Sequence, residues 1–240
     1  SGWIRSASAL RKLEVANNKL DCAVLLEAIS VNDALVASLE LLDISQNKLG
    51  TKGASTLGDV LKHSSEYMCL VLQEMVGGLN KAQIKAILEP SGKNPQRRSM
   101  IPSESEQSWK LKIDLSGNEL HGAKATQLAK SIATGPGPSL VSLSLDSCAI
   151  GPEGLVDLFN KLSGCAQSLE FLDLDGNMKK DSGVVFKSGG AEKAGSALAG
   201  LINSPNAGAL RALHICGIPD HIWPAKALVP VFHALENNQT

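Results

Sequence analysis

The sequence has few aromatic residues, no long apolar run and almost no net charge. Phe, Trp and Tyr make up 3% of the 240 residues, although hydrophobic residues make up 43%. A core must therefore be built from Leu, Ile, Val and Ala. No apolar run reaches the ~18 residues that a membrane-spanning helix needs, so we expect no direct membrane insertion. The formal net charge of −1 favours neither nucleic acid nor an anionic membrane as a partner.

Cysteine is also scarce. The chain has five cysteines, an odd number, and none of them forms a CxxC pair: Cys22, Cys69, Cys148, Cys165 and Cys216. A disulfide framework is therefore not expected, and a reducing compartment is the natural setting. Because no signal-peptide pattern occurs either, the sequence predicts a cytoplasmic protein.

What the sequence does have is a recurring leucine pattern of the form L-x-x-L-x-L-x-x-N/C-x-L. It is complete around Asn18, Asn47 and Cys148, lacks one position around Asn118 and around Asn177, and is degenerate in two further places. The ninth positions of the seven copies are residues 18, 47, 75, 118, 148, 177 and 218. Most intervals between them are 28–30 residues, and the two longer ones are one repeat plus a loop insertion.

The second half of each copy has helical spacing. Gly53, Leu57 and Leu61 lie six, ten and fourteen residues after Asn47, four residues apart from one another, and the same spacing recurs after Cys148. We expect the glycine to permit a tight entry into the helix. The pattern predicts an α/β fold, a leucine-rich-repeat solenoid shaped like a horseshoe. Parallel strands line its concave face, helices line its convex face, and residues 3–240 form one domain of about seven repeats, similar to the ribonuclease-inhibitor-like class.

The ninth position predicts a ladder of buried amides. A buried asparagine needs partners for its amide, and in such repeats it bonds the backbone of the adjacent turn. We expect Asn18, Asn47, Asn118 and Asn177 to do this. Cys148 occupies the same slot, which indicates a structural thiol rather than a reactive one.

Two insertions interrupt the repeats, at about residues 89–108 and 179–190. Their Pro, Ser, Gly and charged residues are typical of solvated loops, although a docking loop would have the same composition. Trp223 could serve as a surface anchor or cover a hydrophobic edge. No terminal capping pattern occurs, and we therefore expect the chain to be part of a longer protein.

The concave face provides the candidate site. Strand residues between the leucines point to it, and acidic residues recur there. The candidate protein-binding residues are Glu14, Asp43, Asp114, Asp146, Asp173, Asp175 and His214. Three interpretations remain open: a docking face for a basic partner, a cation site at Asp146, Asp173 and Asp175, or a local role that keeps this face hydrated.

No sequence motif indicates catalysis. Nucleophile-elbow, zinc-protease, phosphate-binding and dinucleotide-binding patterns are all missing, and the five histidines lack zinc-ligand spacing. The sequence therefore predicts a binding protein, with no enzymatic activity, no cofactor and no metal.

Several stretches in order are similar to the CARMIL family of actin-regulating scaffolds: LELLDISQNKLGTKG, LKIDLSGNELHGAKATQLAKSI, LVSLSLDSCAIGPEGL and LEFLDLDGNMKKDSG. The lengthened repeat after Asn177 resembles that family as well. The resemblance implies actin-regulatory protein partners, a cytoskeletal or cortical location, and a possible homodimer in the full-length protein. The family's capping-protein-binding, membrane-binding and dimerising regions lie outside the repeats, so no functional residue transfers to this chain.

Other functions of the same solenoid class remain open. One is an activator of the small GTPase of nuclear transport, although such proteins commonly carry an acidic tail that this chain lacks. Another is an immune sensor or an inhibitor of a secreted enzyme. Inhibitors of that kind have many ladder cysteines, whereas here only Cys148 clearly occupies a ladder position.

Overall fold

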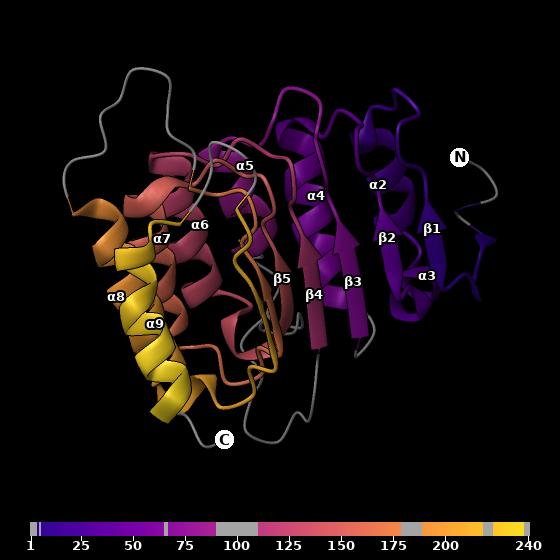
Figure 1. Ribbon diagram of the computed structural model, residues 1–240. Coiled ribbons are helices and arrows are strands. Elements are labelled where there is room, and N and C mark those ends of the chain that lie inside the picture. The colour runs from indigo at the N-terminus through magenta and orange to yellow at the C-terminus, as the bar shows by residue number, and fades with distance from the viewer. Residues whose placement is uncertain are drawn as a thin grey trace.

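The computed structural model describes residues 4, 6–64, 67–89, 110–178, 189–217 and 223–237. Within these ranges, seven strands form one parallel sheet in chain order. Figure 1 shows the N-terminus beside the first strand and the C-terminus beside the last helix, at opposite ends of the solenoid. The strands are β1 (Lys12–Glu14), β2 (Leu41–Asp43), β3 (Tyr67–Val71), β4 (Lys110–Asp114), β5 (Leu140–Ser144), β6 (Phe171–Asp173) and β7 (Ala212–His214).

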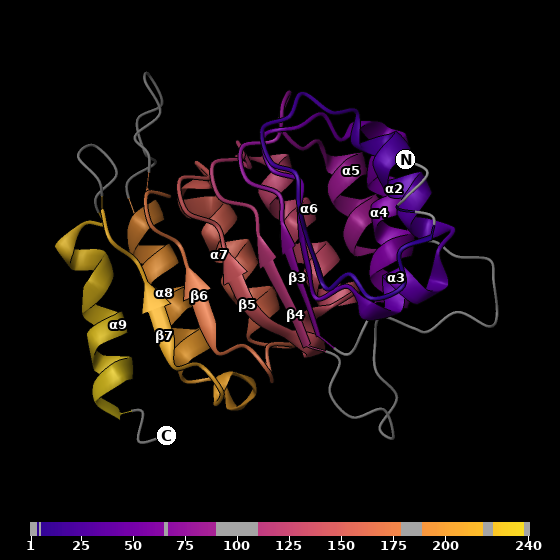
Figure 2. The ribbon, with the colours of Figure 1, turned by 90° about the vertical axis from the view of Figure 1, so that its right-hand side faces the viewer.

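Helices connect successive strands and pack together along the convex side, each against the next, as the two ribbon views show (Figures 1 and 2). A parallel sheet requires such crossovers, because each strand must return to the same end before the next begins. The helices are α2 (Cys22–Ser30), α3 (Asp33–Ser38), α4 (Gly50–His63), α5 (Lys81–Leu88), α6 (Ala123–Thr134), α7 (Gly151–Leu162), α8 (Gly190–Ile202) and α9 (Ala225–Asn237), with the short 3-10 turns η1 (Gly137–Ser139) and η2 (Pro205–Ala207).

The strand register confirms the predicted repeat. One leucine position of the template pairs across the whole sheet, through Leu13, Leu42, Leu70, Ile113, Leu143, Leu172 and Leu213. Successive residues of a strand point to opposite faces of the sheet, so this row points toward the helices and the residues on either side of it point outward. The predicted fold class is thereby confirmed.

The core consists of aliphatic layers, as the composition predicts. Helix α7 illustrates how a helix covers the sheet: Leu155, Leu158, Phe159 and Leu162 recur at helical spacing and are all buried. Phe159 is the largest fully buried side chain. A single repeat could not bury this face alone, so each layer depends on its neighbours for stability.

The predicted role of the glycine six residues after the ladder position is wrong. Gly53 and Gly154 lie inside helices α4 and α7 rather than at their entries. A Cβ at Gly154 would lie 2.6 Å from the Ala125 Cβ of the preceding helix, so this glycine permits close helix packing. The tight entries are made three residues earlier, by Gly50 (φ 65°) and Gly151 (φ 74°).

The asparagine ladder forms at three of the four predicted positions. Asn47, Asn118 and Asn177 are buried, and each donates from Nδ2 to a carbonyl of the preceding repeat: Val15 at 2.8 Å, Leu72 at 2.6 Å and Leu145 at 2.6 Å. Cys148 bonds the Leu115 carbonyl in the same way, with Sγ 3.2 Å from the oxygen.

Asn18 departs from the prediction. Its side chain is exposed and bonds only the carbonyls of its own turn, Val15 and Ala16. A ladder asparagine is buried only between two repeats. Asn18 lies in the first repeat of the sheet, and its amide reaches no backbone of another repeat.

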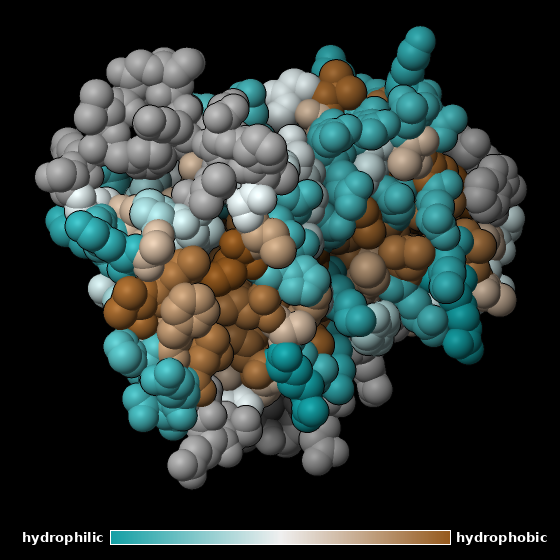
Figure 3. All heavy atoms as spheres, viewed as in Figure 1, coloured by the Kyte–Doolittle hydropathy of each residue, from teal (hydrophilic) through white to brown (hydrophobic). Residues whose placement is uncertain are grey.

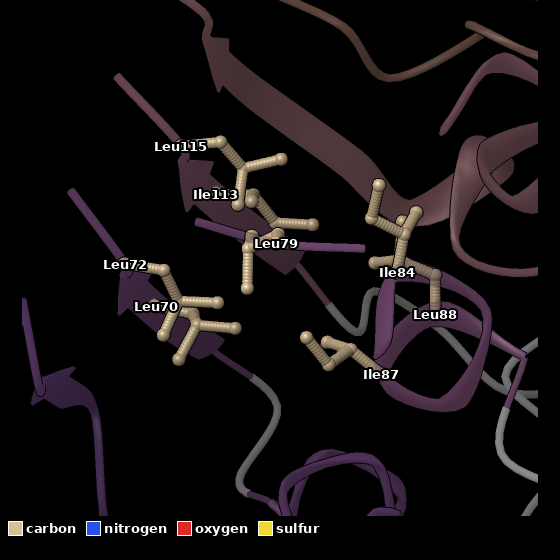
Figure 4. Close-up of a pocket in the computed structure, with 8 residues that line it drawn as sticks. All are labelled: Leu70, Leu72, Leu79, Ile84, Ile87, Leu88, Ile113 and Leu115. Atoms are coloured by element: carbon tan, nitrogen blue, oxygen red, sulfur yellow. The ribbon is translucent and has the colours of Figure 1, made fainter. Parts of the chain in front are cut away.

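A small cavity lies between strands β3 and β4 and helix α5, with a volume of about 10 Å³. Helix α5 has 8 residues where α4 has 14, so it covers the sheet less completely. Figure 4 shows the eight aliphatic side chains that line the cavity: Leu70, Leu72, Leu79, Ile84, Ile87, Leu88, Ile113 and Leu115. With this volume and no polar lining, the cavity is a packing defect that stays dry, not a ligand site.

The predicted insertions fall largely outside the described residues. Of residues 89–108, only Glu89 is described, and its carboxylate accepts a hydrogen bond from Ser131 Oγ at 2.6 Å. Of residues 179–190, only Gly189 and Gly190 are described, at the start of α8. Trp223 is 4% exposed, so it belongs to the hydrophobic edge and is not a surface anchor.

Candidate functional site

One row of outward-facing residues crosses the concave face at the carboxyl ends of the strands. The sheet register places its members side by side in chain order: Glu14, Asp43, Val71, Asp114, Ser144, Asp173 and His214. We call these residues the acidic row. Strands about 4.8 Å apart make a row about 30 Å long. The structure therefore aligns five of the seven candidate residues in one line.

Three aspartates of the acidic row also shape the turn that follows their strands. Oδ1 of Asp43 and of Asp114 accepts the backbone N–H two residues later at 2.9 Å, and Asp173 does the same at 3.1 Å. This side-chain turn explains why aspartate recurs here, since its short carboxylate can accept a nearby backbone N–H. One oxygen of each of these three carboxylates therefore has a local role within its own turn.

The second oxygens of two of these carboxylates join a network that runs across the face. Gln73 Nε2 donates to Asp114 Oδ2 at 2.6 Å, and Ser144 Oγ donates to Asp173 Oδ2 at 3.1 Å. Ser116 Oγ lies 3.0 Å from Ser144 Oγ. Because the Ser144 hydroxyl has one proton, which it gives to Asp173, Ser116 donates to Ser144. The network holds the polar surface in a defined arrangement.

The two remaining candidates, Asp146 and Asp175, each lie two residues after the acidic-row position of their repeat, in the turn that follows the strand. Asp146 Oδ1 accepts from Ser147 Oγ at 2.9 Å, and Asp175 Oδ1 accepts the backbone N–H of Cys216 at 2.6 Å. Both side chains are half-buried. Because these residues follow the acidic-row positions closely, they border the acidic row at the carboxyl ends of the strands.

The predicted grouping of acids for a cation changes in the structure. Asp173, Asp175 and His214 bring one possible ligand atom each within 4.8 Å of one another, and Asp146 is not part of this group. The His214 ring packs edge-on against Phe171, with ring centres 4.9 Å apart. Carboxylate and imidazole groups are zinc ligands. Spacing alone does not assign a metal, however, because exposed acidic groups are common where none binds.

Sequence reasoning missed a second outward-facing row, two residues before the acidic row. Its members are Lys12, Leu41, Cys69, Lys112, Ser142, Phe171 and Ala212. The concave face is therefore acidic only toward the carboxyl ends of the strands. Strand periodicity alone would have found this row, since residues two apart share a face.

The lysine of this second row on β4 is fixed by an aromatic neighbour. Lys112 Nζ lies 5.5 Å from the centre of the Tyr67 ring. A hydrogen bond to the Tyr67 hydroxyl raises the pKa of the Lys112 ammonium. Lys112 therefore adds a positive charge to the second row, on the side of the face away from the carboxyl ends of the strands.

The cysteines agree with the structural role predicted for Cys148. All five are free thiols, and only Cys216 is exposed. Burial raises the pKa of the Cys148 thiol to about 12 and that of Cys22 to about 11. Since the thiolate is the nucleophile, we expect neither thiol to react readily in the folded protein.

We therefore expect alkylation to be selective. At pH 8, iodoacetamide should modify Cys216 rapidly while Cys22 and Cys148 stay unmodified, because they are buried and un-ionised. Peptide mass spectrometry after a time course measures this. In denaturant all five should react, which provides the control. Rapid native modification of Cys148 would contradict its place in the ladder.

Comparison with known proteins supports the same architecture. The sequence matches the family described as "Leucine Rich repeat" at residues 37–58 and 138–159. The chain has a leucine-rich-repeat fold. Such solenoids present extended surfaces that bind other proteins. No curated protein matches the sequence significantly.

Two solved structures resemble this leucine-rich-repeat chain. One is the tropomodulin C-terminal domain of Caenorhabditis elegans, with a TM-score of 0.50 and 18% identity over 77% of this chain and 92% of that chain. The other is the leucine-rich-repeat-containing protein LegL7 from Legionella pneumophila, with a TM-score of 0.48 and 15% identity over 95% of this chain and 71% of that chain. At 18% identity, the likeness to the tropomodulin domain concerns the fold alone. No described helix is long and apolar enough to cross a membrane.

Proposed function

We propose that this chain is a protein-binding scaffold, that its partner docks on the acidic row, and that the partner belongs to the machinery of actin assembly. The observation that supports docking is the alignment of Glu14, Asp43, Asp114 and Asp173 in one row across the sheet. A line of carboxylates on a fixed support complements a partner segment that carries regularly spaced Lys or Arg.

The polar network strengthens the argument for recognition. A partner loses less free energy on binding a surface whose side chains are already ordered than on binding one that must be ordered first. Ser116, Ser144 and Asp173 are held to one another before any partner arrives. The turn bonds use Oδ1 of the three aspartates, and Oδ2 of Asp114 and of Asp173 each accept one bond of the network. Docking can leave these bonds in place, because a carboxylate oxygen can accept more than one hydrogen bond.

The actin context comes from the resemblance of the repeats to the CARMIL family. The resembling stretches include the segments that carry Asp43, Asp114 and Asp173. The alternatives are a small-GTPase activator or another leucine-rich-repeat sensor or inhibitor, which would use the same fold with other partners. Identifying the protein that binds this chain would distinguish between these functions.

The experiment compares two charge-matched variants in affinity capture. The first is the triple variant Asp43→Asn, Asp114→Asn and Asp173→Asn. Asparagine keeps an oxygen that can accept the turn N–H, so this variant removes three charges while it preserves the turns. The control neutralises three exposed helix carboxylates, Glu153, Glu192 and Glu236, to Gln.

We expect wild-type and control chains to capture the same proteins from a cytosolic extract, as quantified by mass spectrometry. The acidic-row variant should recover about ten-fold less, a loss of about 1.4 kcal/mol in binding free energy. Actin or capping machinery among these proteins supports the actin function. Recovery of a small GTPase would indicate the activator instead. Equal capture by all three chains would rule out the acidic row as the docking surface.

A further inference from the structure

Each repeat of the solenoid is covered by the next through a fixed hydrogen-bond pattern. The residue after each acidic-row position donates its backbone N–H to the acidic-row carbonyl of the following strand. This occurs six times in succession, from Val15 to Asp43 (2.8 Å) through to Leu174 to His214 (2.9 Å). A second series of six runs two residues later, from Asn17 to Ser45 (2.9 Å) through to Gly176 to Cys216 (3.1 Å).

Both series stop at β7. The next donors would be the backbone N–H groups of Ile215 and Gly217, and among the described residues neither has an acceptor. Strand β7 is the last strand in the sheet order, paired with β6 on one side only. A free edge of this kind presents unpaired backbone groups and is a template for another strand.

The apolar layer is open at the same place. Leu172 and Leu174 of the sixth repeat are 0% exposed. The matching residues of the seventh repeat, Leu213 and Ile215, are only half-buried. The exposure differs because the seventh repeat covers the apolar side chains of the sixth, whereas no described repeat covers those of the seventh.

Helix α9 is apolar on two sides. One side packs on α8 through the buried residues Ala227, Val231 and Ala234. The other exposes Val229 (50%), Phe232 (55%) and Leu235 (52%). Figure 3 shows a broad hydrophobic area where α9 faces the viewer, extending toward the neighbouring strand. Exposed apolar patches of this kind mark interaction surfaces.

We propose that this end of the solenoid is a docking surface for one further strand–helix unit of leucine-rich-repeat type. The end surface consists of Leu213, Ile215, Val229, Phe232 and Leu235, together with the N–H groups of Ile215 and Gly217. The unit adds a parallel strand to β7, supplies the two missing carbonyl acceptors, and lays an apolar helix on α9. The proposal is independent of the partner that binds the acidic row.

Continuity with the interfaces inside the chain argues for this occupant. The end surface repeats each part of the six internal junctions: the donor series, the inward leucines and the apolar helix side. An isolated helix would leave the donors of β7 without acceptors, and an isolated strand would leave α9 exposed. A unit that contains both satisfies both.

The first test uses the 240-residue chain itself. Hydrogen–deuterium exchange at residue resolution should show the amides of Ile215 and Gly217 exchanging about 100-fold faster than those of Leu174 and Gly176, which occupy the same series one repeat earlier. An apolar fluorescent dye, anilinonaphthalene sulfonate, should bind the chain. The variant Phe232→Asp should reduce the dye signal without lowering Tm.

The second test adds the proposed occupant. A copy of residues 140–168 is appended through a short flexible linker, and a scrambled copy of the same composition is the control. We expect the true copy to slow exchange at Ile215 and Gly217, abolish dye binding and raise Tm by about 4 °C or more. In the extended chain Phe232→Asp should lower Tm, because Phe232 then lies in an interface.

Two results would overturn the proposal. Slow exchange at Ile215 and Gly217 in the monomeric 240-residue chain would mean that the edge is already covered. Slow exchange that appears only with dimerisation, measured by light scattering, would show that a second copy is the occupant. If the appended copy leaves exchange at Ile215 and Gly217 as fast as the scrambled copy does, a strand–helix unit is not the occupant and the proposal is overturned, even where the original chain shows fast exchange and dye binding.

Discussion

Asn47→Ala should lower the free energy of unfolding by about 3 kcal/mol. The Asn47 amide accepts from the backbone N–H groups of Asn18 (3.1 Å) and Leu20 (2.9 Å) and donates to the Val15 carbonyl (2.8 Å). Alanine leaves these groups without their partner between two repeats, and each unsatisfied buried group costs about 1–3 kcal/mol. Thermal unfolding followed by circular dichroism should show Tm falling by roughly 6–12 °C.

Asn18→Ala is the matched control for this prediction. Asn18 holds the same template position, but its side chain is exposed and bonds only its own turn. We expect it to cost about 1 kcal/mol or less, because water can replace the lost bonds. Equal losses in the two variants would show that asparagine acts here through its own turn and not through a ladder between repeats.

Phe159→Ala should destabilise the chain by about 3–5 kcal/mol. Phe159 is fully buried in α7, in the middle of the stack, so truncation removes apolar contacts and leaves a cavity that its neighbours fill only partly. Urea unfolding at equilibrium measures the loss as a lower midpoint.

Phe232→Ala supplies the comparison. Phe232 also lies on a solenoid helix, α9, but its side chain is 55% exposed. In the 240-residue chain this change should alter the free energy of unfolding by about 0.5 kcal/mol or less. A large loss from Phe232→Ala would mean that the α9 face is packed in solution, and it would argue against the open end surface.

The sequence predicted the strand register correctly because a period of two residues leaves no freedom. Once Leu42 and Leu143 face the helices, Asp43 and Ser144 must face outward, and the leucine template aligns one repeat with the next. The leucine spacing alone therefore predicts the acidic row residue by residue. Its function as a docking surface remains a proposal.

What the sequence could not predict depends on neighbours in space. The exposure of Asn18 follows from its place in the first repeat of the sheet, which the template does not encode. Asp175 and His214 lie close together because β7 pairs with β6 in the regular register although the repeat between them is lengthened. The spacing of Gly154 predicts a helix entry wrongly, because spacing alone cannot separate an entry from a close contact between helices.

Hydrogen–deuterium exchange of the chain, with and without the strongest partner found by affinity capture, tests the central claim most directly. If the partner docks on the acidic row, binding should slow exchange in the segments that end β2, β4 and β6 and in the turns that follow, at residues 43–46, 114–117 and 173–176. Exchange in the outer turns of helices α4, α6 and α7 should stay unchanged. Protection confined to those helices, with the strand ends unaffected, would contradict the claim that the concave face is the binding surface.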